Sequence, residues 1–386
     1  MKTTAIIPLR KGSKSIVNKN KKKILGRPLF TWVLGEAIAS NLDEIYIYTD
    51  DESIINFVKN EYKWTTKVYV MVRSEKSATD EASTEFAMKE FSAKIQYNFD
   101  VLCLLQATSP LTTKEDINKS LEKLVNNKYD SCLSVVEYKR FFWNEEGVSI
   151  NYDYNNRARR QDFKGTLVEN GAVYVTTKSQ FIHSGNRLGG NIGIVKMPED
   201  TFTEVDEPDD LVVVEKLLLR RLKHKKKTPT SIKAVVLDVD GVFTNGNITY
   251  SIDGEFSKEY NMQDGMGIEL LRESNLPIVV MTSEKSDIVG HRMNKLNIEH
   301  VYSGVKDKYS LLDHLLKDLN LKRNDVAYVG DDVNDLANLC SVGWGFCPAN
   351  AMDEVKMESD VILTNRGGLK AIREVVRFIL NYNQRF

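Results

Sequence analysis

The sequence predicts an α/β protein of two domains, each with a mostly parallel, Rossmann-like sheet flanked by helices. Short apolar stretches alternate with helix-length stretches, a pattern typical of parallel sheets. The chain has 386 residues, too many for one typical core. A lysine run with a proline, LKHKKKTPTS, interrupts the middle of the chain. We therefore expect a first domain over 1–222, a basic linker over 223–230 and a second domain over 231–386.

The composition indicates a globular protein without a marked charge. Hydrophobic residues make up 42% of the chain, and 53 basic residues nearly balance 54 acidic ones. No net field favours nucleic acid as a partner, and no apolar run reaches the ~20 residues of a membrane span. The first residues, MKTTAIIPLRKG, lack a long apolar region, so we expect no signal peptide. The four cysteines lack metal-binding spacing, which fits reduced residues of a cytoplasmic protein.

Short apolar stretches and longer mixed stretches define the elements of the first domain. Strands are expected at about Thr4–Pro8, Glu44–Thr49, Lys67–Val72, Asp100–Gln106, Ser131–Val136, Ala172–Thr176 and Asn191–Lys196. Helices are expected at about Leu29–Ser40, Glu81–Lys94 and Leu211–Lys223. The pair Asn170–Gly171 favours a turn.

A basic loop over residues 10–23 follows the first expected strand. It carries several lysines, an arginine, glycine and serines, and no acidic residue. Most such runs are merely solvated. This one lies between a strand and a helix, where backbone N–H groups and basic side chains suit a polyphosphate.

An acidic segment, TEVDEPDD, precedes the last helix of this domain. Its final acids favour a helix N-terminus and need no other role. Glu204 and Asp206 alternate on one side of an extended stretch, so they are better candidates for a hard cation, which prefers oxygen ligands.

The second domain begins with a buried strand, Val235–Leu237, followed by Asp238 and Asp240. Residues i and i+2 of a strand end point to the same side, so both carboxylates face one pocket. That pocket lies at the carboxyl edge of the sheet, where open α/β sheets bind their ligands. The two carboxylates repel each other unless a cation lies between them or one holds a proton. The pair therefore indicates a site rather than a turn.

Further elements of the second domain follow this motif. They are a hairpin within 247–265 with its turn at Asp253–Gly254, helices at Gly267–Glu273 and Tyr309–Leu319, and strands at Pro277–Met281 and Val326–Val329.

Residues 1–222 resemble the CMP-sialic acid synthetases (N-acylneuraminate cytidylyltransferases). The similar motifs are IIPLRKGSKSIVNKN, LLQATSPL, RRQDFKGTLVENGAVYV and TEVDEPDDL, in the family's order. The resemblance implies a nucleotidyltransferase fold and attack of a nine-carbon α-keto acid sugar on the α-phosphorus of CTP, with release of pyrophosphate. It places Arg10, Ser13, Lys14 and Lys19 at the triphosphate, Asn20, Arg73 and Ala82 at the cytidine, Gln106, Thr108, Ser109 and Arg160 at the sugar, and Glu204 and Asp206 at Mg²⁺. Arg10 and Lys14 are the implied catalytic cations.

Residues 231–386 resemble the capless haloacid dehalogenase-like phosphatases that act on KDO 8-phosphate and sialate 9-phosphates. The resemblance implies Asp238 as nucleophile, Asp240 as general acid and base, Thr282 and Lys308 at the phosphoryl group, and Mg²⁺ held by Asp238, Asp240 and Asp331. Leu369 and Lys370 depart from the Arg–Gly that related phosphatases usually have. Capless relatives are tetramers whose hairpins cover a neighbouring site, so a homotetramer through this domain is expected.

Together the resemblances imply a bifunctional enzyme that dephosphorylates a nonulosonate 9-phosphate, of KDN or N-acetylneuraminate, and couples the free sugar to CTP. Two alternatives stay open. In the first, the second domain is a non-catalytic tetramerisation module, as in vertebrate synthetases that lack the nucleophile, although the intact acid set argues against this. In the second, the sugar is legionaminate, pseudaminate or KDO, of which KDO suits the nucleotide loop least.

Overall fold

The computed structural model describes residues 1–252 and 254–384, and these divide into two compact units. The first unit comprises Met1–Lys22 and Pro28–Leu217, and the second comprises Lys23–Arg27 and Leu218–Phe386. The division falls inside helix α7 (Pro208–Lys225), five residues before the expected domain end at 222, and this helix also occupies the start of the expected linker. Asp253, half of the expected hairpin turn, lies outside the described residues.

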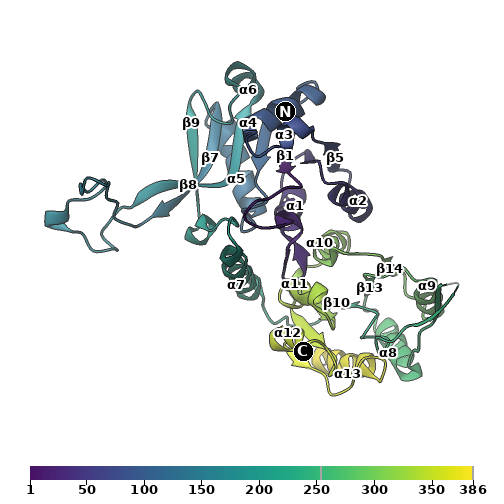
Figure 1. The fold of residues 1–386 in the computed structure, drawn as a ribbon. Helices are drawn as coiled ribbons and strands as arrows, with labels where there is room; N and C mark the ends of the chain where they lie inside the picture. Colours follow the sequence, from purple (N-terminus) through teal and green to yellow (C-terminus); the bar gives the residue numbers. More distant parts are fainter. Residues whose placement is uncertain (253, 385–386) are drawn as a thin grey trace. The chain divides into compact units, whose positions relative to one another are not determined.

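The first unit is built on a mixed sheet with the strand order β5-β4-β1-β6-β8-β7-β9 (Figure 1). Its strands are β1 (Thr3–Leu9), β4 (Glu44–Thr49), β5 (Val68–Val72), β6 (Val101–Leu105), β7 (Ser131–Tyr138), β8 (Thr166–Thr177) and β9 (Ile192–Met197). Its helices, besides α7, are α1 (Leu29–Ala39), α2 (Glu52–Glu61), α3 (Glu75–Ala78), α4 (Thr84–Lys94), α5 (Lys114–Asn126), α6 (Lys178–Ser184) and the 3₁₀ turns η1 (Lys19–Lys21), η2 (Tyr154–Asn156) and η3 (Glu199–Phe202). β1 pairs in parallel with β4 and β6, whereas β8 runs antiparallel to β6 and β7. The prediction of a mostly parallel sheet is confirmed.

Helices cover both faces of this sheet because β1 is apolar on both sides. Ala5 and Ile7 pack in one cluster with residues of α1, α2 and α5, whereas Ile6 packs in another with residues of α4 and α6. Alternate residues of a strand point to opposite faces, so a strand buried on both faces reads as a continuous apolar run. This accounts for the sequence TTAIIPL.

Strand β8 differs most from its expectation. Asn170 and Gly171 were expected to turn the chain, but both lie inside this long strand, where its pairing with β7 shifts register. Gly171 has φ +65°, so the glycine serves an irregularity of the strand rather than a turn. Before β8, residues 139–165 form an arm that projects from the sheet of this unit (Figure 1).

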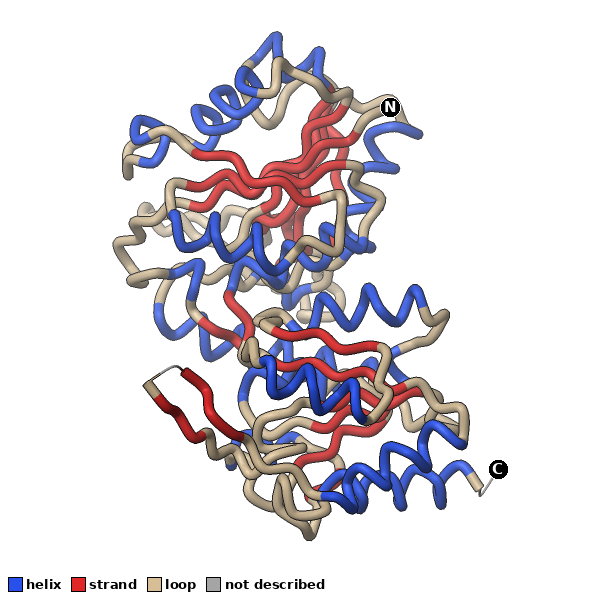
Figure 2. Tube along the Cα trace, turned by 90° about the vertical axis from the view of Figure 1, so that its right-hand side faces the viewer, coloured by secondary structure: helices blue, strands red, loops and turns tan. Residues whose placement is uncertain are grey.

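The second unit is built on a parallel sheet with the strand order β14-β13-β10-β15-β16-β17. Its strands are β10 (Ala234–Leu237), β13 (Ile278–Thr282), β14 (His300–Ser303), β15 (Val326–Val329), β16 (Trp344–Cys347), β17 (Val361–Ile362) and the hairpin strands β11 (Thr249–Ser251) and β12 (Gly254–Ser257). Its helices are α8 (Met262–Glu273), α9 (Asp287–Lys295), α10 (Lys308–Asp318), α11 (Leu336–Leu339), α12 (Asp353–Glu358), α13 (Ala371–Asn383) and the 3₁₀ turns η4 (Arg323–Asp325) and η5 (Val333–Asp335). Helices again lie on both sides of the sheet, and the β11–β12 hairpin projects from this unit (Figure 2).

The central strand β10 organises the core of the second unit. All of its residues are buried, and Val235 and Leu237 pack with residues of α8, α9 and α13. Because β10 pairs in parallel with β13 and β15, their carboxyl ends lie at one edge of the sheet. Asp238, Thr282 and Asp331 come from these ends, so the topology gathers them as the sequence predicts.

A short segment from the beginning of the chain, residues 23–27, belongs to the second unit. It forms the two-residue strand β2 (Lys23–Ile24) and the start of β3 (Arg27–Pro28). The buried Arg27 guanidinium donates to both carboxylate oxygens of Asp307, at 2.9 and 3.1 Å. Asp307 is the N-cap of α10, the helix that begins with Lys308. Gly26 has φ +77°, and an added Cβ would lie 2.0 Å from the backbone oxygen of Val333, so this contact requires glycine.

Two further observations concern the described part of the chain. None of its helices combines the length and the apolar character that crossing a membrane requires. The cysteines at 103, 132, 340 and 347 are buried there and form no disulfide.

Candidate active sites

The first unit contains a polar cavity of about 300 Å³ beyond the carboxyl ends of β1 and β6. Eight of the sequence-predicted residues line it: Arg10, Ser13, Lys19, Asn20, Arg73, Ala82, Gln106 and Thr108. They come from the basic loop after β1, the segment after β5 and the segment after β6, and the parallel pairing places the carboxyl ends of these strands at one edge of the sheet. The structure therefore brings members of the implied triphosphate, cytidine and sugar sets to one cavity, although Lys14 is not among the residues that line it.

Asp80, which also lines this cavity, pairs with two of the implied triphosphate cations. Its carboxylate contacts the Arg10 guanidinium and lies 2.9 Å from the Lys14 ammonium. Lys14 and Arg10 together lower the pKa of Asp80 below its ordinary value. Both cations already converge on a single anionic group, as binding of a phosphate requires. No motif in the sequence points to Asp80, because its pairing with these cations depends on the fold.

Residues of the acidic segment contact Lys19, one of the residues that line this cavity. The Lys19 ammonium lies 3.1 Å from an Asp206 carboxylate oxygen and 2.9 Å from the backbone oxygen of Val205. Burial, followed by the charge of Asp206, raises the pKa of Glu204 to about 7. An added Cβ at Gly171 would lie 2.4 Å from a Glu204 oxygen, so the glycine makes room for this carboxylate. A carboxylate whose charge is disfavoured by burial and by a neighbouring carboxylate suits a divalent cation, which both groups could bind.

Two implied sugar residues do not line the cavity. Ser109 is buried, and its hydroxyl has no hydrogen-bond partner among the described residues. Arg160 lies in the projecting arm, where its guanidinium is largely exposed and contacts Glu199 at 3.2 Å. The structure therefore leaves their role as a prediction.

The second unit contains a buried charged group centred on Lys308. The Lys308 ammonium lies 2.7 Å from Asp238 and 2.8 Å from Asp335, and its side chain is fully buried. The Tyr328 hydroxyl donates to the same Asp335 oxygen at 2.7 Å. Burial opposes the charge of Lys308, but the two carboxylates outweigh it and hold the pKa of Lys308 above its ordinary value.

Asp331 adds a third carboxylate to this group. Oxygens of Asp238, Asp331 and Asp335 all lie within 4.8 Å of one another, so one cation can contact all three. Burial, together with the charge of Asp335, raises the pKa of Asp331 to about 7. Burial also raises the pKa of Asp238, although Lys308 opposes the shift. Three carboxylates around one ammonium leave an excess of negative charge that fits a divalent cation.

The carboxylate of Asp240, which was expected as a metal ligand, pairs with a lysine side chain. It accepts a hydrogen bond from the Lys258 ammonium at 2.6 Å, and the described metal group has Asp335 as its third member. An added Cβ at Gly241 would lie 1.9 Å from an Asp331 oxygen, so the close approach of the Asp331 carboxylate requires glycine at this position. Thr282 is buried at the end of β13, where its hydroxyl accepts from the Glu284 backbone N–H at 3.2 Å.

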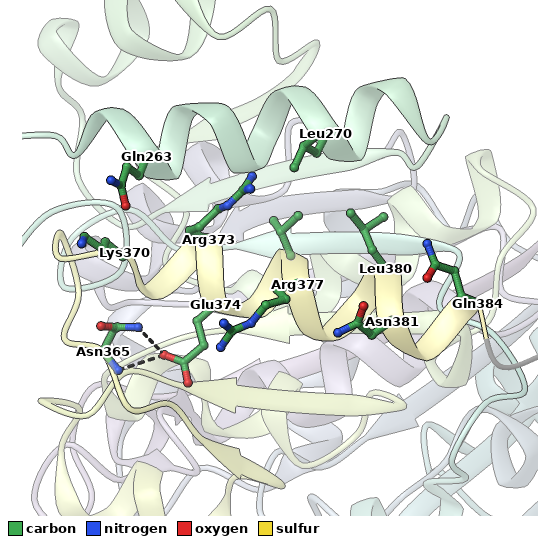
Figure 3. A pocket seen from close by; sticks show the side chains of 11 residues that line it. Gln263, Leu270, Asn365, Lys370, Arg373, Glu374, Arg377, Leu380, Asn381 and Gln384 are labelled. Carbon is green, nitrogen blue, oxygen red and sulfur yellow. Dashed lines mark hydrogen bonds between the residues drawn. The ribbon is translucent and has the colours of Figure 1, made fainter.

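A larger pocket of about 460 Å³ lies between α8 and α13 (Figure 3). Lys370, Arg373 and Arg377 line it, and so does Glu374, whose carboxylate accepts hydrogen bonds from Asn365 at 2.7 and 2.9 Å. The pocket contains none of the converging carboxylates of the Lys308 centre, so it does not supply the hydrolytic groups. It includes Lys370, one of the two departures noted in the C-terminal loop.

Fold and sites together define an α/β enzyme that joins a cytidylyltransferase unit to a haloacid dehalogenase-like unit. Residues 4–183 match the cytidylyltransferase family model, and residues 280–372 match the haloacid dehalogenase-like hydrolase model. An N-acylneuraminate cytidylyltransferase of Oncorhynchus mykiss is 30% identical over 97% of this chain and 88% of its own length. The chain therefore belongs to the N-acylneuraminate cytidylyltransferase family.

The second unit has relatives of its own. The 3-deoxy-D-manno-octulosonate 8-phosphate phosphatase KdsC of Haemophilus influenzae is 34% identical over 39% of this chain and 83% of its own length. The crystal structure of the corresponding phosphatase of Moraxella catarrhalis, in complex with magnesium ion, phosphate ion and KDO, is 33% identical over 44% of this chain and 94% of that one, with a TM-score of 0.39. The predicted fusion of a cytidylyltransferase with a phosphatase-like domain is confirmed.

The raised pKa of Asp331 predicts a pH-dependent effect of Mg²⁺ on stability. Because the folded-state pKa lies above the ordinary value, the carboxyl stabilises the fold at low pH, and this contribution is lost as pH rises through about 7. Metal binding needs the ionised carboxylate. Calorimetry should therefore show that Mg²⁺ raises Tm by several degrees at about pH 8 and by much less at about pH 5.5.

Asp331→Asn should remove the part of the Mg²⁺ effect that arises in the second unit, whereas Asp332→Asn, which changes an exposed neighbour, should keep it. An Mg²⁺ effect that is the same at both pH values would contradict the assignment of Asp331.

Proposed function

We propose that this enzyme catalyses two consecutive reactions. The second unit removes phosphate from a nonulosonate 9-phosphate, and the first unit couples the freed sugar to CTP. The observation that carries this proposal is the Asp238–Lys308 pair, 2.7 Å apart, with Asp331 and Asp335 beside it. A scaffold has no physical need for converging buried carboxylates, so the arrangement favours a catalytic second unit.

In the proposed phosphatase reaction, Asp238 attacks the phosphoryl group. Lys308 orients the Asp238 carboxylate and balances the charge of the incoming phosphate, while the Thr282 hydroxyl at the neighbouring strand end contacts a phosphoryl oxygen. Asp240 gives a proton to the leaving sugar oxygen and later accepts one from water. The covalent aspartyl-phosphate thus divides one difficult hydrolysis into two easier steps.

Both units contain carboxylates that suit Mg²⁺ as ligands. In the second unit, Asp238, Asp331 and Asp335 would hold it, and in the first unit Glu204 and Asp206 would do so. When bound, the ion neutralises phosphate charge next to the attacking and leaving oxygens.

In the proposed cytidylyltransferase reaction, the basic loop binds the triphosphate. Arg10 and Lys14, which converge on Asp80, would contact phosphate oxygens as charge builds on the leaving pyrophosphate. Arg73 and Asn20 line the same cavity at the proposed cytidine position, and Gln106 and Thr108 line it at the proposed sugar position.

KDN and N-acetylneuraminate are the sugars we propose first, with legionaminate or pseudaminate as alternatives. The relatives support an acidic nine- or eight-carbon α-keto sugar: the relatives of the whole chain are named for N-acylneuraminate, and those of the second unit for 3-deoxy-D-manno-octulosonate 8-phosphate. Dephosphorylation followed by coupling gives the fusion a rationale, because the first product is the second substrate. The reduced, buried cysteines support a cytoplasmic location.

Asp238→Asn tests whether the two proposed reactions take place in separate units. Hydrolysis of KDN 9-phosphate and N-acetylneuraminate 9-phosphate, followed as phosphate release with Mg²⁺, should fall at least about 10³-fold because the amide is no nucleophile. Coupling of the free sugar to CTP should stay within about twofold, because the residue lies in the other unit.

Asp332→Asn is the matched control, since Asp332 is exposed and does not join the carboxylate group. If the parent enzyme releases no phosphate from either ester, the second unit is a tetramerisation module or acts outside this sugar class.

Lys14→Ala tests the triphosphate assignment. We expect kcat for CTP coupling to fall about 10²-fold while KM for CTP changes little, because the cation acts mainly on charge that develops in the transition state. Steady-state kinetics with a pyrophosphate assay measure both. Lys11→Ala serves as the control, because among the described residues Lys14 pairs with Asp80 whereas Lys11 makes no such ion pair. An unchanged kcat in Lys14→Ala would rule out this role.

We also propose a homotetramer held together through the second unit. Three apolar side chains of the β11–β12 hairpin are largely exposed to solvent. They are Tyr250, Ile252 and Phe256, with exposed fractions of 68%, 102% and 69% relative to an extended reference residue. Such a patch favours burial against another chain. Light scattering should give a tetramer for the parent and smaller species for a Tyr250→Ser, Phe256→Ser double variant. A monomeric parent would contradict this proposal.

A further inference from the structure

We propose that the pocket between α8 and α13 is a second ligand site of the second unit, separate from the Lys308 centre. Its ligand is an acidic sugar that carries both a carboxylate and a phosphoryl group. The site is inferred from the geometry and charge of the pocket, whereas the choice of an acidic sugar rests on the proposed function.

Three cations line this pocket without acidic partners. Lys370, Arg373 and Arg377 make no ion pair with a carboxylate in the described part of the chain. The Nη1 atom of Arg373 is buried and lacks a hydrogen-bond partner among the described residues. Cations that share a pocket without counter-ions favour an anionic ligand, and a guanidinium can bind a carboxylate or a phosphate through two hydrogen bonds.

Two carboxylates of the same region are already engaged by neutral donors. Glu374, which lines the pocket, accepts hydrogen bonds from the backbone and the side chain of Asn365 at 2.9 and 2.7 Å. Asp264 accepts hydrogen bonds from the backbone N–H groups of Lys370 and Arg373 at 3.3 and 2.9 Å. Because neither carboxylate pairs with a cationic side chain of the pocket, the excess of positive charge remains available to a ligand.

Close packing of α8 against α13 fixes the position of Arg373. An added Cβ at Gly267 of α8 would lie 3.4 Å from Cα and 3.7 Å from Cδ of Arg373, so the arginine stem lies against a residue without a side chain. The hydrogen bonds to Asp264 hold the first turn of α13, where Lys370 is the N-cap. Groups that are held in place before binding lose less conformational freedom when a ligand arrives.

The residues that line the pocket change in character along α13 (Figure 3). Lys370 and Gln263 lie at one end of the pocket, and Asn381, Gln384 and the apolar Leu380 lie at the other. A bare anion needs only the cationic end, whereas amides and apolar surface suit the hydroxyls and the carbon skeleton of a sugar. The volume of about 460 Å³ lies within the usual range of small-molecule sites.

Two compounds of the proposed reactions have this chemistry. They are the nonulosonate 9-phosphate that the second unit consumes and the CMP-sugar that the first unit produces. Both carry a carboxylate and charged oxygens on phosphorus, and two anionic groups on one ligand match three cations better than one group does. A binding experiment distinguishes the two sources.

Hydrogen exchange of the full-length enzyme tests the inference. CMP-N-acetylneuraminate or N-acetylneuraminate 9-phosphate is added in the presence of EDTA, which prevents metal-dependent turnover. At about ten times the dissociation constant, amides of residues 371–384 that exchange through openings that release the ligand should exchange about tenfold more slowly. Protection by only one of the two compounds identifies it as the ligand. No protection by either compound at millimolar concentration would overturn the inference.

A matched pair of charge reversals locates the binding. Arg377→Glu should abolish the protection, because it replaces one of the three cations with an anion, whereas Arg366→Glu should retain it. Both arginines are exposed, but Arg366 does not line the pocket. Arg373→Met should also abolish the protection, and Arg377→Glu decides alone if Arg373→Met does not fold. Protection that survives Arg377→Glu would overturn the inference.

Failure of this inference differs from failure of the proposed function. If the parent catalyses neither reaction but residues 371–384 are protected, the proposed reactions are wrong and the second site stands. If both reactions occur but neither compound protects these residues, only the second site is wrong. If inorganic phosphate protects them as strongly as the sugars do, the pocket binds simple anions and the acidic-sugar ligand is wrong.

Discussion

The second unit depends on the burial of one ammonium, that of Lys308, among carboxylates. A buried charge without partners costs several kcal/mol, so Lys308 stays inside only because Asp238 and Asp335 lie within 2.8 Å of it. These residues come from the end of β10, the start of α10 and the turn η5. Their ion pairs therefore hold three separate segments at one point, and the excess of carboxylates leaves room for a further cation.

The positions of several site residues could be predicted because they follow strands directly. Thr282 is the last residue of β13, Asp238 directly follows β10 and Asp331 lies two residues beyond β15, and parallel pairing brings those ends together. Asp335 was less predictable. It shares the run GDDVND with Asp332, and only the structure shows that Asp335 is buried at the group while Asp332 is exposed.

Other features could not be read from local patterns, because they depend on contacts between distant segments. Asp80 meets Arg10 across 70 residues of sequence, and Lys258 meets Asp240 only because the hairpin folds back. Gly171 looked like part of a turn, but its small size admits Glu204 beside a long strand. In each case the residue type was informative, whereas its partner was decided by tertiary structure.

The segment at residues 23–27 bears on how separable the two halves are. Arg27 supplies the guanidinium that faces Asp307, and Gly26 admits the backbone of Val333, yet both precede the rest of the second unit by about 190 residues of chain. A fragment that starts at residue 218 would lack these groups, so the second half of the chain does not contain every residue of the second unit. A lineage that deleted the first half would have to replace Arg27 before the remaining half could regain the same buried contacts. The first half of the chain thus contributes residues to the fold of the second unit, so the two halves are more than two separate proteins joined by a linker.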